Sequence, residues 1–513
     1  MSEIKTALIS VSDKKGIEEF ARELQELGVK IISTGGTYKK IKEAGLKVIP
    51  IEEFTNFPEI MDGRVKTLHP KIHGGILAVR NNALHQKQMK ENSIEGIDLV
   101  AVNLYPFKET IAKNSPLEEC IENIDIGGPT LIRAAAKNYE DVTVIVDPQD
   151  YERVIKELKE NKKVLLETKR ILAAKAFQLI AEYDALIAQY LNREFLQEEF
   201  PEKIALTYEK MQECRYGENP HQKGFVYREP ITKESDIVNA KILWGKEMSF
   251  NNFLDAHSSI ELLKEFEEPT AVIVKHNNPC GVASSKELSE AFQKAYECDP
   301  VSAFGGIIAL NRPLDLKTAE KIISFFNEAV IAPGFEEKAL ELIKTKKNLR
   351  ILELNLNSKK IKGMEFKKIS GGLLLEDKDS HEMKKEELKF VSQKKPSEKE
   401  IGELLYAWKI VKHIKSNAIV VTKEKAAIGI GIGQTNRVLS ARIALEQAGE
   451  KARNAVIASD GFFPFKDSIE LAGKFGIKAV IEPGGSLNDK EVIEEADRQG
   501  IALVFTGIRH FKH

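Results

Sequence analysis

The feature that most restricts the fold of this chain is a repeated alternation of short apolar runs with stretches of helical spacing. The first part of the chain has apolar runs of strand length at residues 6–11, 29–33, 48–51, 99–104 and 142–146. Between them, apolar residues recur every three or four positions, as they do in 16–27. Strands that alternate with helices pair in parallel through helical crossovers, so this order predicts an α/β domain with helices on both faces of a parallel sheet.

A second α/β region follows a long helical pattern over residues 166–195. The polar, acidic segment 197–202 contains Pro201, so we expect a boundary there, with domains at 1–197 and 198–513. Later apolar runs lie at 271–274, 306–310, 330–332, 418–421, 426–431, 455–458, 479–481 and 502–505.

Two features suggest that the second region is itself divided. The highly charged stretch 376–395 shows little periodicity, and we interpret it as a connection between two subdomains. The triplet Val274-Lys275-His276 is echoed by Val411-Lys412-His413, which hints at duplicated halves.

Composition excludes several classes of protein. A net charge of −2 over 513 residues provides no overall field to recruit nucleic acid or an anionic membrane surface. No apolar stretch approaches the ~20 residues that span a bilayer, and the first residues lack the pattern of a signal peptide. The four cysteines are scattered and form neither a metal-type cluster nor a disulfide framework. We therefore expect a cytoplasmic protein that contacts neither nucleic acid nor membrane.

The segment of the second region whose side chains best suit catalysis is Lys275-His276, which directly follows the apolar run 271–274. A turn that contains Pro279 is expected to stop this strand. A lysine beside a histidine can supply a fixed positive charge and a proton acceptor. The alternative is an exposed strand end with a solvated lysine and a capping histidine.

Polar turn segments in the first region suggest a phosphate site. They cover residues 10–14, 33–37, 62–67 and 125–130, and all but the third precede helical patterns. Helix N-termini offer free N–H groups to anions, and Gly35 and Gly36 allow a ligand to approach the backbone closely. Arg64 and Lys66 add full positive charges. Each segment alone could be an ordinary loop; their ordered series indicates a cradle for phosphate.

The candidate metal motifs are incomplete. His69 and His73 are four residues apart, but Pro70 separates them and no HExxH pattern is present. Pro279-Cys280 resembles part of the zinc nucleobase-deaminase signature, yet Ala283 occupies the position of its second cysteine and no His-x-Glu precedes it. No catalytic metal is expected.

Other polar and aromatic groups stand at the ends of expected strands. Tyr105 follows one strand, and Lys137 lies late in an Ala-rich helical pattern, where a desolvated lysine could transfer protons. In Phe462-Phe463-Pro464-Phe465, two of the three phenylalanines are expected to anchor the core, whereas a third could form a wall for a flat heterocycle. The C-terminal segment 506–513, which has one Arg and two His soon after a strand, suggests a tail tucked into a site. Gly431 and Gly433 form only a fragment of a dinucleotide fingerprint, so NAD is not inferred.

Considered together, these ordered motifs resemble those of the bifunctional purine biosynthesis family, phosphoribosylaminoimidazolecarboxamide (AICAR) formyltransferase/IMP cyclohydrolase. The resemblance runs from residues 10–14 to 509–513 and is most specific at 275–281, 62–67, 462–467 and the C-terminus. It implies a methylglyoxal-synthase-like N-terminal domain and two cytidine-deaminase-like subdomains without the metal. It also implies a homodimer whose formyltransferase sites lie at the subunit interface.

The resemblance implies two activities and their co-substrate. A formyl group would pass from 10-formyltetrahydrofolate to the amine of AICAR, and the product would then close to IMP with loss of water. For ring closure, Lys137 matches the family's proton-transfer lysine, while Lys66, Tyr105 and Asp125 would polarise the formyl oxygen and orient the carboxamide. Position 34 is Thr where some relatives have Ser. The implied contacts to IMP or formyl-AICAR are Ser12, Asp13, Lys14, Thr34, Gly35, Gly36, Thr37, Arg64, Val65, Lys66, Thr67, Asn103, Tyr105, Asp125, Ile126, Gly127 and Gly128.

For formyl transfer, His276 matches the catalytic base and Lys275 the group that stabilises the transition state. Position 328 is Glu where some relatives have Asp. The implied AICAR contacts are Arg215, Tyr216, His276, Gly305, Glu328, Asn417, Arg437, Arg509 and His513. The implied folate contacts are Val438, Phe462, Asp467, Ser486 and Leu487.

Two other functions compete with this hypothesis. A non-catalytic ribotide-binding protein would keep only the phosphate pockets and would bind without turnover. A single-activity lyase of the methylglyoxal-synthase type, joined to an unrelated second domain, would act on dihydroxyacetone phosphate. Both leave the ordered motifs of the second region unexplained.

Overall fold

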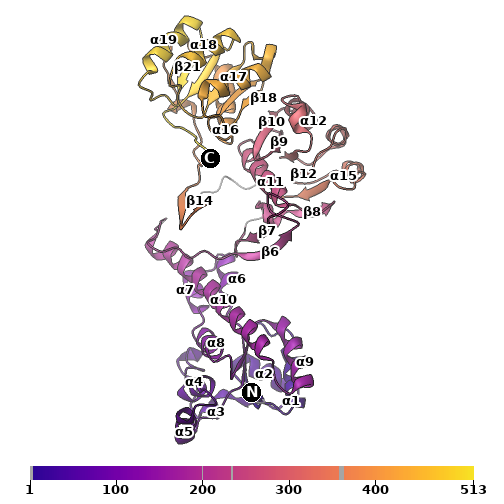
Figure 1. Ribbon diagram of the computed structural model, residues 1–513, viewed down its shortest axis with the longest axis vertical. Helices are drawn as coiled ribbons and strands as arrows, with labels where there is room; N and C mark the ends of the chain where they lie inside the picture. Colours follow the sequence, from indigo (N-terminus) through magenta and orange to yellow (C-terminus); the bar gives the residue numbers. More distant parts are fainter. Residues whose placement is uncertain (1–3, 199, 233–234, 357–362) are drawn as a thin grey trace. The chain divides into compact units, whose positions relative to one another are not determined.

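The computed structural model describes residues 4–198, 200–232, 235–356 and 363–513 (Figure 1). The chain divides into two compact units, which we describe separately. Unit 1 comprises Met1–Tyr208 and Glu229–Ile231, and unit 2 comprises Glu209–Arg228 and Thr232–His513. The boundary proposed from the sequence, between residues 197 and 198, falls within unit 1 and stays a prediction.

Unit 1 contains the predicted parallel sheet. Its strands are β1 (Thr6–Ser10), β2 (Lys30–Ser33), β3 (Ile49–Pro50), β4 (Leu99–Val102) and β5 (Thr143–Ile145). They lie in the order β3-β2-β1-β4-β5, and every neighbouring pair is parallel. The helices are α1 (Ile17–Glu26), α2 (Gly35–Glu43), α3 (Ile51–Thr55), α4 (Pro70–Leu77), α5 (Ala83–Glu91), α6 (Phe107–Ala112), α7 (Leu117–Glu122), α8 (Gly127–Lys137), α9 (Tyr151–Asn161) and α10 (Leu166–Leu191).

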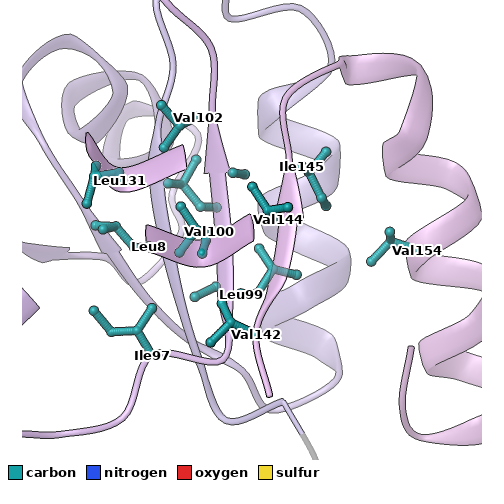
Figure 2. Packing of buried hydrophobic residues seen from close by; sticks show 14 of the residues in the cluster. Leu8, Ile97, Leu99, Val100, Val102, Leu131, Val142, Val144, Ile145 and Val154 are labelled. Atoms are coloured by element: carbon teal, nitrogen blue, oxygen red, sulfur yellow. The ribbon is translucent and has the colours of Figure 1, made fainter. Parts of the chain in front are cut away.

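The core of unit 1 explains why its strands are continuous apolar runs. Leu8, Val100 and Val144 lie on the neighbouring strands β1, β4 and β5 and are at most 1% exposed (Figure 2). Leu131 of α8 and Val154 of α9 belong to the same cluster. A parallel sheet covered on both faces selects such runs, and burying each large aliphatic side chain contributes roughly 1.5–3 kcal/mol. This core holds the strand ends, and the loops that follow them, in place.

Unit 2 is built on one mixed sheet of 12 strands within the described residues. Its order is β16-β21-β20-β19-β17-β18-β10-β9-β11-β12-β13-β8. These strands are β8 (Lys241–Trp244), β9 (Thr270–Lys275), β10 (Asn278–Ser284), β11 (Ile307–Leu310), β12 (Ala329–Ala332), β13 (Arg350–Glu353), β16 (Lys389–Phe390), β17 (Ile419–Lys423), β18 (Ala426–Gly431), β19 (Val456–Ser459), β20 (Ala479–Glu482) and β21 (Ala502–Phe505). Two hairpins stand apart from it, β6 (Glu209–Cys214) with β7 (Gly224–Arg228) and β14 (Met364–Ile369) with β15 (Gly372–Asp377).

The strand pairing of unit 2 repeats in two halves, and helices separate many of the strands in both. The helices are α11 (Phe250–Leu263), α12 (Leu288–Tyr296), α13 (Pro300–Ala303), α14 (Leu316–Ile322), α15 (Glu337–Lys344), α16 (Glu398–Val411), α17 (Arg437–Ala448), α18 (Asp467–Lys474) and α19 (Asp489–Gln499). Reading outward from the β18–β10 junction, both halves of the sheet show the same sequence of antiparallel and parallel pairings. The two halves are therefore duplicates, as the sequence hinted.

The register of the duplication differs from the predicted one. Ser249 and Ser397, which are 148 positions apart, are the N-caps of α11 and α16, and each closes a capping box. With this offset the counterpart of Lys275 is Lys423, at the end of β17. Lys412-His413 instead follows helix α16. The predicted equivalence was wrong because a helix end and a strand end happen to share the letters Val-Lys-His.

The strand that ends at Lys275 is not followed by a turn that contains Pro279. That prediction was wrong. His276 and Asn277 form a two-residue turn with φ of 57° and 61°, and the chain returns as β10. Pro279 lies inside that strand, opposite Val274. Positive φ at both central residues is the signature of the tight hairpin turn that suits twisted strands. Pro279 is tolerated because β10 pairs with β18 only near its far end, at Ala283.

The charged stretch 376–395 includes a short strand. Its residues Lys389–Phe390 form β16, which pairs with β21 at one end of the sheet. On either side of this stretch, the two halves share one apolar core, which includes Val272, Leu404 and Ile481. The stretch therefore connects two halves that are packed together within unit 2.

Two strand glycines at equivalent places in the duplicates predict a loss of stability. A Cβ at Gly281 would lie 1.9 Å from the carbonyl oxygen of Ala295, and a Cβ at Gly429 would lie 1.9 Å from that of Ala444. Because a backbone atom cannot rotate away, Gly281→Ala and Gly429→Ala should each reduce the free energy of unfolding by about 3 kcal/mol in urea titrations. Gly402→Ala, in open space on α16, is the control and should slightly stabilise the protein. An unchanged urea midpoint for Gly281→Ala would contradict this packing.

Candidate active sites

The first site lies at the carboxyl edge of the sheet in unit 1, where the loops after β1 and β4 are tied together. The side-chain oxygen of Asn103 accepts the N–H groups of Ser12 (2.6 Å) and Asp13 (3.0 Å). The amide nitrogen of Asn103 donates to the carbonyl of Asp13 at 2.9 Å. Carboxyl ends of parallel strands meet at one edge, which is where α/β folds place ligands. Asn103 therefore acts as a brace between two of the predicted nucleotide loops.

The loop after β2 joins the same edge. Thr37 Oγ1 accepts the N–H of Val11 at 3.0 Å and donates to its carbonyl at 2.9 Å, so this hydroxyl is used to hold the loop. The Oγ atoms of Thr34 and Ser10 are 2.9 Å apart. The α2 N-terminus, at Gly35 and Gly36, remains as a source of free N–H groups.

Two ammonium groups flank that helix N-terminus. A Cβ at Gly35 would lie 3.6 Å from Lys66 Nζ, and one at Gly36 would lie 3.6 Å from Lys14 Nζ. Lys66 Nζ also lies 3.1 Å from Glu59 Oε1, a partner that no sequence motif pointed to. Free backbone N–H groups together with two cations form a site for an anion such as phosphate. Arg64 does not point into this cluster, since its guanidinium pairs with Glu122.

The beginning of α8 adds a carboxyl group to the site. Asp125 Oδ1 accepts the N–H of Gly128 at 2.8 Å, and Thr67 Oγ1 lies 2.7 Å from where a Cβ of Gly127 would be. Burial raises the pKa of Asp125 above its ordinary value, while backbone N–H groups oppose that rise. Tyr183, from α10, accepts the N–H of Asp125 at 2.8 Å. Sequence reasoning missed Tyr183 because nothing in its helical surroundings marks it.

Lys137 is not brought next to these loops. It is the last residue of α8, about 15 Å along the helix from Gly127 at 1.5 Å per residue, and it is exposed. It lines a cavity of about 920 Å³ together with Leu68, Thr130, Arg133 and Phe177. Leu68 follows Thr67, so the cavity begins beside the nucleotide loops and runs along α8 toward Lys137.

The second site is centred on the hairpin turn of β9 and β10 in unit 2. The His276 side chain is exposed, and Lys275 is half-buried. Lys275 Nζ donates to the carbonyl oxygen of Phe304 at 2.7 Å and lies 3.9 Å from where a Cβ of Gly305 would be. Neither residue points into a packed interior. An ammonium held by a carbonyl, beside a solvent-reachable imidazole, can take part in acid–base chemistry.

Glu328 is joined to the segment after Gly305, because its N–H donates to the carbonyl of Gly306 at 3.0 Å, but its side chain already has a partner. It precedes β12, and its Oε2 accepts from Arg350 Nη1 at 2.6 Å. Sequence reasoning missed Arg350. The half-exposed carboxyl can still contact a ligand through its other oxygen.

Arg437 is buried, unlike a typical ribotide contact. It is 6% exposed, donates from Nη1 to Ser459 Oγ at 2.9 Å and pairs with Asp460, a residue that no motif marked. Its other terminal nitrogen donates to the side-chain oxygen of Asn417. Two of the predicted ribotide residues, Asn417 and Arg437, therefore contact each other, and Asn417 is the more accessible of the two.

The C-terminal tail packs against the same region, and its role in a binding site stays a prediction. The N–H of His510 donates to the carbonyl of Asp460 at 2.9 Å, and Ser416 exchanges hydrogen bonds with the Lys512 backbone at 2.9 and 3.1 Å. His510 is buried and its Nδ1 lies 2.5 Å from Asp379 Oδ2. Lys415, which precedes Ser416, donates its N–H to Asn278 Oδ1 at 3.1 Å. The segment that the tail packs against therefore also contacts the hairpin of His276. Arg509 and His513 remain exposed.

The proposed folate segments form a neighbouring pair of loops. Asn488 Nδ2 donates to the carbonyl of Pro464 at 2.7 Å, which joins residues 462–467 to 486–488. Phe463 is 1% exposed, whereas Phe462 and Phe465 are 38% and 59% exposed. The expectation that two of these three phenylalanines belong to the core was therefore wrong. Only one points inward because the segment is an irregular turn without a strand's alternation.

A buried carboxyl lies behind these loops. Glu482, at the end of β20, is fully buried, and its Oε2 accepts the N–H of Phe463 at 2.7 Å. Burial raises its pKa to about 8, so the side chain is largely protonated at neutral pH. The remaining predicted folate residues lie around the loops: Asp467 begins α18, Val438 is in the first turn of α17, and Ser486 and Leu487 precede α19.

Arg215 and Tyr216 follow β6, with the guanidinium 5.8 Å from the centroid of the tyrosine ring. Asn251 Nδ2, in the first turn of α11, donates to the carbonyl of Glu218 at 3.3 Å, which brings the segment after Tyr216 to α11.

Within the described ranges, no cluster of three or more His, Cys, Asp or Glu side chains is arranged to hold a metal ion. In the same part of the chain, no helix combines the length and apolar character needed to cross a membrane.

Comparison with known proteins identifies the family of this chain. The model of the MGS-like domain matches residues 16–130, and that of the AICARFT/IMPCHase bienzyme matches residues 135–447. Three relatives carry the name bifunctional purine biosynthesis protein PurH. They come from Thermoanaerobacter sp. (58% identity over 510 residues), Acetivibrio thermocellus (57% over 513) and Bacillus cereus (55% over 510), with 99% of this chain and 100% of each relative covered. A structure titled "Crystal structure of ForH" is 35% identical, covers 37% of this chain and 98% of its own, and has a TM-score of 0.34. By its full-length identity to the PurH proteins and its match to both family models, this chain belongs to the bifunctional AICAR formyltransferase/IMP cyclohydrolase family.

Proposed function

We propose that the two activities of this family are divided between the two units, with ring closure in unit 1 and formyl transfer in unit 2. The chain is a bifunctional enzyme of IMP synthesis. It transfers a formyl group from 10-formyltetrahydrofolate to the amine of AICAR, and it closes formyl-AICAR to IMP with loss of water. The observation that supports this division is that the exposed His276 and the neighbouring Lys275 belong to a hairpin of unit 2, whereas the predicted nucleotide loops belong to unit 1.

In formyl transfer, we assign His276 as the base. The amine of AICAR is conjugated to an electron-poor ring and is therefore a weak nucleophile. A neutral imidazole takes its proton as the nitrogen attacks the formyl carbon. The bond between that carbon and the folate nitrogen then breaks, and the departing nitrogen takes up a proton. The Lys275 ammonium stabilises the oxyanion that forms in between, a contribution typically worth ~3–4 kcal/mol.

In ring closure, the carboxamide nitrogen attacks the formyl carbon of the same molecule, and a water molecule leaves. Because both reacting groups belong to one substrate, holding its two ends in place supplies much of the acceleration. We assign the α2 N-terminus, Lys14 and the adjoining loops to the phosphate. Lys66 and Tyr105 would polarise the formyl oxygen, while Asp125 would orient the carboxamide.

Binding roles for the remaining predicted residues are part of the same proposal. Asn417, held by the buried Arg437, would contact the ribotide, and the exposed Phe462 would contact the folate ring. Arg215, Tyr216, Arg509 and His513 keep their proposed ribotide roles. We further propose a cytoplasmic homodimer that contacts neither nucleic acid nor membrane. The four cysteines, each free and buried, support a reducing compartment.

An assay of the whole chain tests this function. Purified protein supplied with AICAR and 10-formyltetrahydrofolate should produce IMP, and protein supplied with formyl-AICAR alone should produce IMP without folate. Binding of AICAR without turnover would favour a ribotide-sensing protein instead. Activity on dihydroxyacetone phosphate would favour a lyase of the methylglyoxal-synthase type.

The cavity along α8 yields a separate prediction about Lys137. We expect Lys137→Ala to slow ring closure of formyl-AICAR by about 100-fold, within the range for loss of a proton-transfer group, and to leave formyl transfer unchanged. Lys162→Ala, on another helix end of unit 1, is the control. Steady-state rates with each substrate distinguish the two activities. Normal ring closure by Lys137→Ala would remove this lysine from the mechanism.

A further inference from the structure

The turn that carries His276 has an unfavourable sequence for its geometry. Two-residue hairpins with positive φ at both central positions prefer Asn-Gly, because a side chain at positive φ is crowded by the backbone. Here the two positions are occupied by His276 (φ 57°) and Asn277 (φ 61°). Asparagine and histidine tolerate this region better than most side chains do, but neither has the freedom of the glycine that the second position prefers. Other contacts must therefore stabilise the turn.

One carboxylate supplies those contacts. Asp255 lies in α11, which packs against β9. Its two oxygens accept the backbone N–H groups of the turn, Oδ1 from Asn277 at 2.6 Å and Oδ2 from His276 at 3.2 Å. Ser258, one turn further along α11, donates to Asn277 Oδ1 at 3.3 Å. Bonds from backbone N–H groups to an ionised carboxylate are shorter and stronger than bonds between neutral groups.

The duplicated half provides an independent comparison. Glu403 is the sixth residue of α16, as Asp255 is of α11. Its oxygens accept the N–H of Lys425 at 3.0 and 3.2 Å. Lys425 and Glu424, with φ of 56° and 55°, form the turn that corresponds to Asn277 and His276. The carboxylate brace is thus a feature of both halves, but only one of the two braced turns carries the Lys-His pair.

We propose that Asp255 is the positioning residue for formyl transfer. It holds the His276 backbone in a left-handed conformation from which the imidazole and the neighbouring Lys275 ammonium reach the same substrate. Asp255 is half-buried on a helix, so it is a rigid reference point for the turn. This inference rests on the proposed role of His276 as the base. It adds a group that contacts the backbone of the turn and not the reacting atoms.

Removing this brace should lower the rate of formyl transfer more than it lowers binding. We expect Asp255→Ala to reduce kcat for formyl transfer by about 100-fold, since small misplacements of a reacting group have effects of that size. KM for AICAR should change less than about threefold, because the proposed AICAR contacts outside this turn are untouched. Asp255→Asn retains one acceptor oxygen and the shape of the side chain, so its kcat should lie between that of the unmodified chain and that of Asp255→Ala. It also replaces Asp255→Ala if the latter does not fold.

Glu403→Ala is the matched control, because it removes the corresponding carboxylate from the duplicate turn, where that carboxylate accepts the N–H of Lys425. We expect it to leave formyl transfer within about twofold of the unmodified chain, while its melting temperature falls about as much as that of Asp255→Ala. Equal losses of kcat in Asp255→Ala and Glu403→Ala would show a general structural effect and overturn the proposal. Unchanged kcat in Asp255→Ala would overturn it as well.

A rescue experiment tests whether Asp255 acts through the turn. Asn277→Gly places glycine where this turn type prefers it, so the double variant Asp255→Ala/Asn277→Gly should recover about tenfold in kcat over Asp255→Ala. No recovery would overturn the role in holding the turn. His276→Ala is measured in the same assay to separate two failures. If His276→Ala is fully active, the assignment of the base fails; if it is inactive while Asp255→Ala is normal, only the present inference fails.

Discussion

Replacing His276 with alanine should abolish formyl transfer while ring closure of preformed formyl-AICAR continues at its normal rate. The imidazole is the exposed group at the end of β9, and the substitution removes this proposed base from beside the Lys275 ammonium. Loss of a positioned general base typically costs 10²–10⁴-fold, and a reduction of about 10³-fold corresponds to about 4 kcal/mol of transition-state stabilisation. Rates with AICAR plus 10-formyltetrahydrofolate, and with formyl-AICAR alone, measure the two activities separately.

The duplicated half of unit 2 supplies the control for this experiment. Glu424 occupies the place of His276 in the β17–β18 turn and has φ of 55°. Glu424→Ala changes an equivalent turn at a position with no proposed chemistry, so both activities should persist. Loss of both activities in His276→Ala, with the melting temperature unchanged, would contradict the division of labour between the two units.

Much of the sheet could be predicted from the sequence because its strands are buried on both faces. Runs such as 99–104 and 479–481 stand out against amphipathic helices, and the structure has strands at Leu99–Val102 and Ala479–Glu482. Strand β4 ends at Val102, before the end of the predicted run, where the chain enters the loop of Asn103. Asn103, directly after β4, lies outside the strand, and its side chain holds the loop of Ser12.

Other features depend on contacts between distant parts of the chain, which local patterns do not record. Strand β10 was missed because Pro279 reads as a strand breaker, although its missing N–H faces a side of the strand that needs no partner there. Asp255, Tyr183 and Glu482 lie in unremarkable helical or strand sequence and act through backbone groups far along the chain. Residues that touch substrate recur in short motifs, whereas residues that hold them are known only from the fold.

The resemblance to a family predicted reactive residues but not their surroundings. Arg437 was predicted as a ribotide contact, and the structure places it in a buried pair with Asp460, where it orients Asn417. A buried ion pair is costly to break from one side, because the remaining charge is left without a partner. An isolated sequence motif cannot distinguish a charge that binds a ligand from one that holds a neighbour.

The other large effect is expected at Asp125, in ring closure. Its Oδ1 accepts the N–H of Gly128 at the start of α8, beside Thr67 and the Lys66 loop. Asp125→Asn keeps an acceptor oxygen for Gly128 but removes the negative charge that would orient the carboxamide. We expect ring closure to fall by about 100-fold, or about 3 kcal/mol, with formyl transfer unchanged. Asp147→Asn, at another carboxylate that caps a helical turn of unit 1, should leave both activities intact.

The pH dependence of ring closure provides a second measurement of the same role. Burial raises the pKa of Asp125 above its ordinary value of 3.8 in the folded protein. If the ionised form is required, kcat should fall as the pH decreases through that raised pKa, at a higher pH than an exposed aspartate would give. Asp125→Asn has no such group and should lose this acidic limb. A variant that keeps both the rate and the limb would show that another group orients the carboxamide, because no residual contact of the asparagine can reproduce a titrating charge.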